Sequence, residues 1–200
     1  MKRLLLFGLA LTLYISGCNS NGSPDSVKEA KTETSQKRDS LHHVERPGDT
    51  TVFTIPEQDA AFLINAASNG MLEIELGQLA QIHAGSQRVK AFGNRMIRDH
   101  SKDSEDLKSL ADSKRVTFPN SISNDQQKKK EKLQKKSGPE FDKSYISLMI
   151  EDYKEDIREF KKAAENAKDP DIKAFANTRL FLLQQHLNSA ESLWKHTKKM

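Results

Sequence analysis

Downstream of Pro56, apolar residues recur three and four positions apart along four long stretches of the chain. This spacing predicts four amphipathic α-helices, because side chains at i, i+3, i+4 and i+7 share one face of a helix. The first helix is expected over residues 57–84, between Pro56 and Gly85. The second begins after Ser86 and ends before the turn-forming residues 117–120. The apolar face of the first helix is expected to comprise Phe62, Ile64, Ala66, Ala67, Gly70, Met71, Ile74, Gly77, Ala80, Ile82 and Ala84.

Two further helices follow a long connection. The third is expected over residues 139–167, and the fourth runs from Pro170 almost to the end of the chain, with Asp169 as its N-cap. The connection, residues 113–138, contains a Lys-rich stretch that predicts a short exposed helix over residues 125–136.

The short turn at Gly85 and Ser86 makes the first two helices antiparallel neighbours. The connection between the second and third helices is long enough to span a helix of about 40 Å, so up-and-down and crossover topologies both remain open. We expect an all-α, ferritin-like four-helix bundle with a long connection between helices 2 and 3.

The first 18 residues have the pattern of a bacterial export signal. Lys2 and Arg3 precede an apolar stretch, residues 4–15, which is shorter than the roughly 20 residues that a membrane-spanning helix needs. The tetrapeptide Ile-Ser-Gly-Cys that ends at Cys18 resembles the lipobox of bacterial lipoproteins, in which the cysteine thiol takes a diacylglyceryl group and becomes the first mature residue. We therefore expect residues 1–17 to be a lipoprotein signal peptide, the alternative being a chance cysteine in an ordinary secretory signal.

Cys18 is the one cysteine of the chain, so the exported domain has no disulfide, and acylation would consume its free thiol. Asn19 resembles the outer-membrane sorting signal of enterobacterial lipoproteins. The expected location is the cell envelope, in the outer membrane and facing the periplasm. Residues 18–55 are almost entirely polar and predict a flexible tether, which leaves residues 56–200 as the bundle domain.

Composition and charge exclude several classes of protein. The chain has 200 residues, of which 36% are hydrophobic and 30% charged, as suits one helical domain plus an export segment. The net charge of +4 falls to +2 when Lys2 and Arg3 leave with the signal peptide, so no nucleic-acid partner is indicated. The basic cluster of the connection is more typical of a solvated helix face than of a site for anionic polymer or lipid. Its members are Lys128, Lys129, Lys130, Lys132, Lys135 and Lys136.

Several segments in a fixed order carry a resemblance to a known family. They span residues 62–67, 73–80, 89–100, 138–145 and 182–187. Together they resemble the domain of unknown function 4142 family, small exported bacterial proteins regarded as ferritin-like four-helix bundles. The resemblance implies that fold but no activity.

One departure from the family concerns the third helix. The family often has Asp followed by His there, whereas Asp152 is followed by Tyr153 in this chain.

Four polar residues lie on otherwise apolar helix faces: Glu73, His100, Asp152 and His186. One comes from each helix, and the four could meet in a single layer. Carboxylate and imidazole are the ligands of ferritin-like dinuclear metal sites, but such sites need Glu three residues before His. Ile97 and Leu183 occupy those positions here, so no dinuclear motif is present.

Two interpretations of this polar layer remain open. A mononuclear transition-metal site would use Glu73, His100 and His186, helped by Asp99 or Asp152. The favoured alternative is a hydrogen-bonded layer that fixes the register of the helices and binds no cofactor, with Tyr153 as a donor in place of a histidine.

The sequence contains no Gly-x-Ser-x-Gly elbow, zinc-protease motif or phosphate-binding loop, so no catalytic residue is indicated. The predicted function is that of a non-catalytic lipoprotein, held to the membrane by acyl groups on Cys18, which offers its surface to an envelope protein or ligand. The alternative is a ferritin-like metal-binding or redox protein. The pattern specifies neither the ligand nor the oligomeric state.

Overall fold

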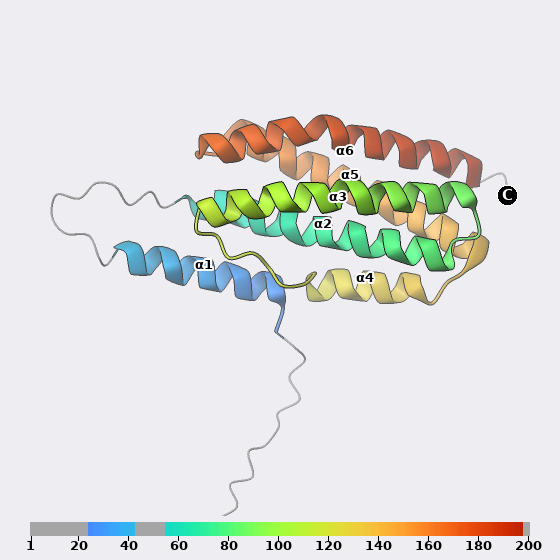
Figure 1. The fold of residues 1–200 in the computed structure, drawn as a ribbon, viewed down its shortest axis with the longest axis horizontal. Coiled ribbons are helices and arrows are strands. Elements are labelled where there is room, and N and C mark those ends of the chain that lie inside the picture. Colours follow the sequence, from blue (N-terminus) through green and yellow to red (C-terminus); the bar gives the residue numbers. More distant parts are fainter. Residues whose placement is uncertain (1–23, 43–54, 198–200) are drawn as a thin grey trace, which may run out of the picture.

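The computed structural model describes residues 24–42 and 55–197. These residues form six helices and no β-strand (Figure 1). Their bounds are α1 Ser26–His42, α2 Glu57–His83, α3 Gln87–Ser113, α4 Asn124–Gln134, α5 Gly138–Asn166 and α6 Pro170–Thr197. The four long helices and the short helix of the connection are confirmed, with ends within a few residues of those predicted.

The four long helices form two antiparallel hairpins, α2–α3 and α5–α6, whose partners lie side by side (Figure 1). After α3 the chain returns along the outside of the bundle through α4 before it enters α5 (Figure 1). The start of α5 therefore lies at the end of α2, where Ala84 and Gly138 form an isolated parallel bridge. Of the two topologies that the sequence left open, the structure has the crossover, which is the ferritin-like arrangement.

Each hairpin turn is held by a buried aspartate of the other hairpin. Asp142 in α5 accepts hydrogen bonds from the backbone N–H groups of Gly85, at 3.1 Å, and Ser86, at 2.9 Å. Asp59 in α2 accepts hydrogen bonds from two backbone N–H groups of the α5–α6 turn, both at 2.8 Å. Both aspartate side chains are buried, and each satisfies two backbone N–H groups of a turn.

The two hairpins are related by a repeat of 83 residues. Asp142 lies 83 positions after Asp59, and the turn amides that the two bind are separated by the same interval. The segment Val-Lys-Ala-Phe that begins at Val89 recurs as Ile-Lys-Ala-Phe beginning at Ile172, again 83 positions later. The bundle is thus built from two similar helical hairpins.

Helix α1 corrects the prediction of a flexible tether over residues 18–55. Its residues Val27 and Ala30 are buried, and the Oγ of Ser26 accepts hydrogen bonds from the backbone N–H groups of Asn120, at 2.8 Å, and Ser121, at 3.1 Å. The prediction failed over α1 because so short an apolar stripe gains its stability from docking on the connection, which composition does not show.

The Lys-rich helix α4 is tied to the bundle by part of its basic cluster. Lys130 lies 2.7 Å from a carboxylate oxygen of Glu75 in α2, and Lys129 lies 3.2 Å from Asp152 in α5. Ser123 caps the helix, and Leu133 packs into the core. These lysines therefore serve partly to hold the crossover in place.

Helices α2 and α3 pack very closely at Gly77 and Gly93. A Cβ atom on Gly77 would lie 2.7 Å from the carbonyl oxygen of Gly93, a distance that no side chain tolerates. The face predicted for the first helix is wrong at Ile82, whose side chain is 74% exposed. Ile82 lies in the last turn of α2, where the neighbouring His83 is the residue that contacts α5, its ring stacked on that of Phe141 with centroids 5.7 Å apart.

The predicted signal peptide and Cys18 lie outside the described residues, as do residues 18–23 and 43–54 of the predicted tether. In the part of the chain that is described, no helix combines the length and the apolar character that crossing a bilayer requires.

Candidate functional site in the bundle core

The core contains a polar layer to which all four long helices contribute. Oε2 of Glu73 in α2 lies 2.9 Å from Nδ1 of His100 in α3. Nε2 of His100 lies 3.1 Å from the hydroxyl of Tyr153 in α5, and that hydroxyl donates to the sulfur of Met96 at 2.6 Å. A continuous chain of polar contacts therefore crosses the interior from α2 to α5.

His186 of α6 completes the layer. Its ring centroid lies 5.2 Å from that of His100 and 5.3 Å from that of Tyr153. Nε2 of His186 lies 3.0 Å from Oδ2 of Asp99, which Arg95 also contacts at 3.2 Å. The structure thus brings together Glu73, His100 and His186, the three residues that the sequence proposed as metal ligands.

Asp152 does not join this layer, which corrects the sequence prediction. Its Oδ1 pairs with Lys129 of the connection, and the buried acid of α5 nearest to the layer is instead Asp156, one turn further on. Sequence reasoning missed Asp156, although the 83-residue repeat marks it: Asp156 corresponds to Glu73, as Asp142 corresponds to Asp59. The internal repeat therefore favours Asp156 over Asp152 as the buried acid of α5 at this level.

The surroundings of the layer favour its neutral form. Burial raises the pKa of Glu73 well above its usual range. Burial also lowers the pKa of His100, and burial together with the neighbouring His100 lowers the pKa of His186 to about 4. A protonated Glu73 can donate to Nδ1 of His100, whose Nε2–H then donates to Tyr153, which leaves the Tyr153 proton for Met96. Every bond of the chain then has one donor and one acceptor.

Asp99, which pairs with His186, differs from Glu73 because its surroundings favour the ionised carboxylate. Burial raises the pKa of Asp99, but hydrogen bonds from His186 and Arg95 outweigh it and lower that pKa overall. An ionised Asp99 accepts the Nε2–H of His186. Nδ1 of His186 is then a buried acceptor, and it has no hydrogen-bond partner among the described residues.

The layer is closed to solvent and offers little space. Glu73 is 2% exposed, His100 5% and His186 0%. A cavity of about 30 Å³ adjoins Glu73 and His100, which is room for about one water molecule. Nowhere among the described residues do three or more His, Cys, Asp or Glu side chains form a group that could hold a metal ion. As arranged, the layer can order protons and fix the helix register.

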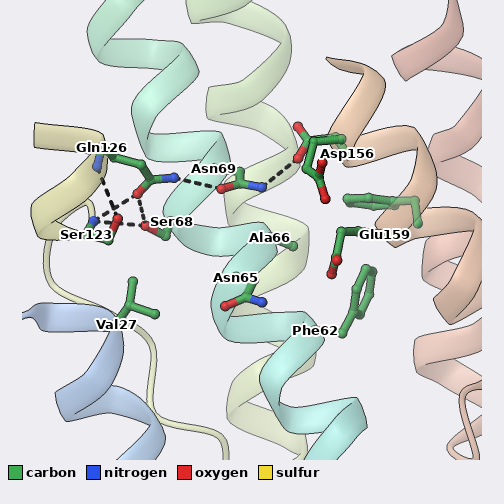
Figure 2. A pocket seen from close by; sticks show the side chains of 12 residues that line it. Val27, Phe62, Asn65, Ala66, Ser68, Asn69, Ser123, Gln126, Asp156 and Glu159 are labelled. Atoms are coloured by element: carbon green, nitrogen blue, oxygen red, sulfur yellow. Dashed lines mark hydrogen bonds between the residues drawn. The ribbon is translucent and has the colours of Figure 1, made fainter. Parts of the chain in front are cut away.

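Asp156 also borders a second, larger cavity on the outside of the α2–α5 pair. This outer cavity has a volume of about 250 Å³ and is lined by α2, α5, α1 and the start of α4 (Figure 2). Gln126 of α4 donates to Asn69 at 2.7 Å, and Asn69 donates to Oδ1 of Asp156 at 2.5 Å. Sequence analysis did not find this cavity, because two of its walls are α1 and the connection.

Comparison with known proteins agrees with the fold. A family described as "Domain of unknown function (DUF4142)" matches residues 46–193, well over half of the chain. The chain belongs to the DUF4142 family. Within this DUF4142 domain, Tyr153 supplies the hydroxyl that His100 contacts. No curated protein matches the chain.

The bundle is also similar to a solved structure, "Crystal structure of DUF305 fragment from Deinococcus radiodurans". The TM-score is 0.64, and the match covers 72% of this chain and 99% of the fragment. With 9% sequence identity, the likeness extends to the fold alone.

Proposed function

We propose that this DUF4142 protein is a lipid-anchored, non-catalytic module of the bacterial cell envelope, which offers the outside of its bundle to an envelope protein or ligand. The observation that carries the non-catalytic part is the closed polar layer, whose central side chains hydrogen-bond to one another and are at most 5% exposed. An active site needs polar groups that a substrate can reach.

The lipobox at Cys18 supports the anchor, and Asn19 supports the outer membrane as its location. Helix α1 begins at Ser26, eight residues after Cys18. Even a fully extended segment of that length spans less than about 30 Å. The anchor would therefore hold the face of the bundle that carries α1 close to the bilayer, because α1 is docked on the bundle.

Substitution of Cys18 by serine tests the anchor. Serine cannot accept the diacylglyceryl group through a thioether, so we expect Cys18→Ser to abolish palmitate labelling and recovery in the membrane fraction. Two acyl chains bind a bilayer stably because each buried methylene contributes about 0.8 kcal/mol, so the loss should be nearly complete. A Ser20→Ala variant is the matched control and should label like the wild type. Palmitate labelling of Cys18→Ser would overturn the anchor.

A second candidate is the retention of one transition-metal ion by Glu73, His100 and His186. Two unpartnered buried atoms favour it, Oε1 of Glu73 and Nδ1 of His186, since both could serve as ligand atoms. The side chains would have to reorient, because Nδ1 of His100 now contacts Glu73 and Nε2 of His186 contacts Asp99.

Metal analysis of untagged protein, purified without chelators, separates the two candidates. If the layer only fixes the helix register, we expect less than about 0.1 metal ion per chain in neutral buffer. A metal site needs three or four ligand atoms that already converge on one point, and the closed layer does not present them. A stoichiometric metal that disappears in the His100→Ala, His186→Ala double variant would favour the second candidate. His196→Ala, on an exposed histidine of α6, is the control substitution.

A further inference from the structure

The ionisable side chains that line the outer cavity are all acidic. It lies between α2 and α5 and is closed at one end by α1 and α4 (Figure 2). Three of its lining side chains are carboxylic acids, and none is Lys or Arg.

A relay of hydrogen bonds fixes the polar wall of the cavity. The hydroxyl of Ser68 and the backbone N–H of Ser123 donate to Oε1 of Gln126. Gln126 donates to Asn69, and Asn69 donates to Asp156 (Figure 2). Every bond in this relay donates toward Asp156, so the wall is arranged in advance to favour negative charge on that carboxyl group.

Asp156 is a buried acid with an unused acceptor. Its side chain is 3% exposed, and Asn69 bonds to Oδ1 alone. Asn69 leaves Oδ2 to other donors, and this oxygen is not one of the fully buried side-chain atoms that lack a partner in the described part of the chain. A cation in the cavity could therefore reach Oδ2 and pair with it.

The rest of the cavity suits the apolar part of a small molecule. Phe62 and Phe160 meet edge to face with centroids 5.0 Å apart, and both line the cavity with Val27 and Ala66. Aromatic rings also attract an ammonium group within about 6 Å of the centroid. Carboxylate and aromatic groups together are the combination that recognises organic ammonium ions.

We propose that the outer cavity binds a small organic cation through its ammonium group. Asp156 and the half-buried Glu159 hold the ammonium group, while Phe62 and Phe160 contact the alkyl part. Glu155 is already paired with Arg158, so it contributes less. The proposal names a ligand class for the binding module proposed above and rests on that function, but it does not depend on the anchor at Cys18.

The adjoining part of the groove limits the length of the ligand. A cavity of about 220 Å³ shares Phe62, Asn65 and Glu159 with the outer cavity and continues between α2 and α5 toward Lys162. Asp59 also lines this part, but its Oδ2 already accepts two backbone N–H groups, and the ammonium of Lys162 repels a second cationic group at that end. A molecule with one ammonium group and a short alkyl chain therefore fits best.

Binding should be linked to release of a proton. Burial raises the pKa of Asp156 well above its usual range, whereas a bound ammonium ion favours the ionised carboxylate. The charged and titratable groups that face Asp156 are Glu73 of α2, His100 and Asp103 of α3, Asp152 and Glu159 of α5, and Arg179 of α6.

Isothermal titration of the full chain in detergent with butylammonium chloride tests the proposal, with 1-butanol as the uncharged probe of the same shape. We expect saturable binding of butylammonium at millimolar concentration, consistent with the ceiling of about 1.5 kcal/mol per ligand atom, and at least tenfold weaker binding of butanol. Released protons should make the observed enthalpy differ between phosphate and Tris buffers.

Three variants make the result specific to the cavity. Asp156→Asn should weaken butylammonium binding at least tenfold, and Glu159→Gln, on a half-buried side chain that leaves the core intact, at least threefold. Glu165→Gln, on an exposed position of the same helix, should bind like the wild type. Equal binding of butanol and butylammonium, no binding of either, or unchanged binding by Glu159→Gln would overturn the cation site. Each of these outcomes leaves the Cys18 experiment unaffected.

Discussion

Asp142→Ala is expected to lower the free energy of unfolding by about 3 to 4 kcal/mol. The substitution removes two hydrogen bonds from the backbone N–H groups of Gly85 and Ser86 to a carboxylate, and a hydrogen bond to a charged group contributes about 1.5 to 3 kcal/mol. The Asp142 side chain is 3% exposed, so its removal also leaves a cavity beside the turn. Urea denaturation followed by circular dichroism measures the loss, provided that the slope of the transition is unchanged.

The same experiment can be made at the other hairpin turn, because the repeat places an equivalent aspartate there. Asp59 binds the equivalent amides of the α5–α6 turn, so Asp59→Ala should cost a similar amount. The control is Asp112→Ala, on an exposed residue of α3 that pairs with Lys108 at the surface and should change stability by less than about 1 kcal/mol. A loss below about 1 kcal/mol in both Asp142→Ala and Asp59→Ala would show that the aspartates do not hold the turns.

The long helices could be predicted because the signals that define them are local. Apolar residues three and four positions apart mark the buried face, and Asp169 caps α6 through the backbone N–H groups of Asp171 and Ile172, at 2.9 and 3.1 Å. Glu73, His100 and His186 could be identified in the same way, since each interrupts an apolar face. Such features require only the residues within one or two turns.

Features that depend on distant contacts could not be predicted. Helix α1 is held by partners about 90 residues away, such as the bond from the N–H of Thr117 to Thr34, at 2.9 Å. Asp152 and Asp156 lie four positions apart on nearly the same face of α5, so periodicity cannot separate them. What separates them is Lys129, which draws Asp152 toward the connection, and Asn69, which holds Asp156 inside.

The same contacts explain why the candidate sites lie where they do. The closed layer and the outer cavity share the wall formed by α2 and α5, and Asp156 borders both the small inner cavity and the outer one. Burial raises the pKa of Asp156, and ionisation of Glu73 would raise it further. The protonation of the polar layer is therefore coupled to the charge available to a ligand outside it.

Replacement of Glu73 by glutamine should change how stability depends on pH. Burial holds the pKa of Glu73 well above its usual range, while in the unfolded chain this carboxyl ionises near its ordinary value. As pH rises past that ordinary pKa, the unfolded state of the wild type loses the proton first, so the wild type loses stability toward higher pH. Glutamine does not ionise, yet its amide can still donate to His100, so Glu73→Gln escapes this loss.

The free energy of unfolding of Glu73→Gln should therefore rise relative to that of the wild type between pH 5 and pH 8. The gain is about 1.4 kcal/mol for each pH unit over which Glu73 stays protonated, and so at most about 4 kcal/mol across this range. His186, whose pKa is lowered to about 4, destabilises the fold as pH falls below the ordinary histidine value, but it does so in both proteins and cancels in the difference.

Urea denaturation of both proteins at pH 5, 6, 7 and 8 measures this difference, with Glu57→Gln at an exposed position of α2 as the control that should give a flat line. A difference for Glu73→Gln that is independent of pH would mean that Glu73 is ionised in the folded core and that its charge adds no proton to His100. A variant that is less stable than the wild type at every pH, and that also loses a bound metal, would instead support the second candidate. If the layer is hydrogen-bonded through a protonated Glu73, the difference in free energy of unfolding must rise with pH, because glutamine then replaces a carboxyl group that is neutral in the folded state.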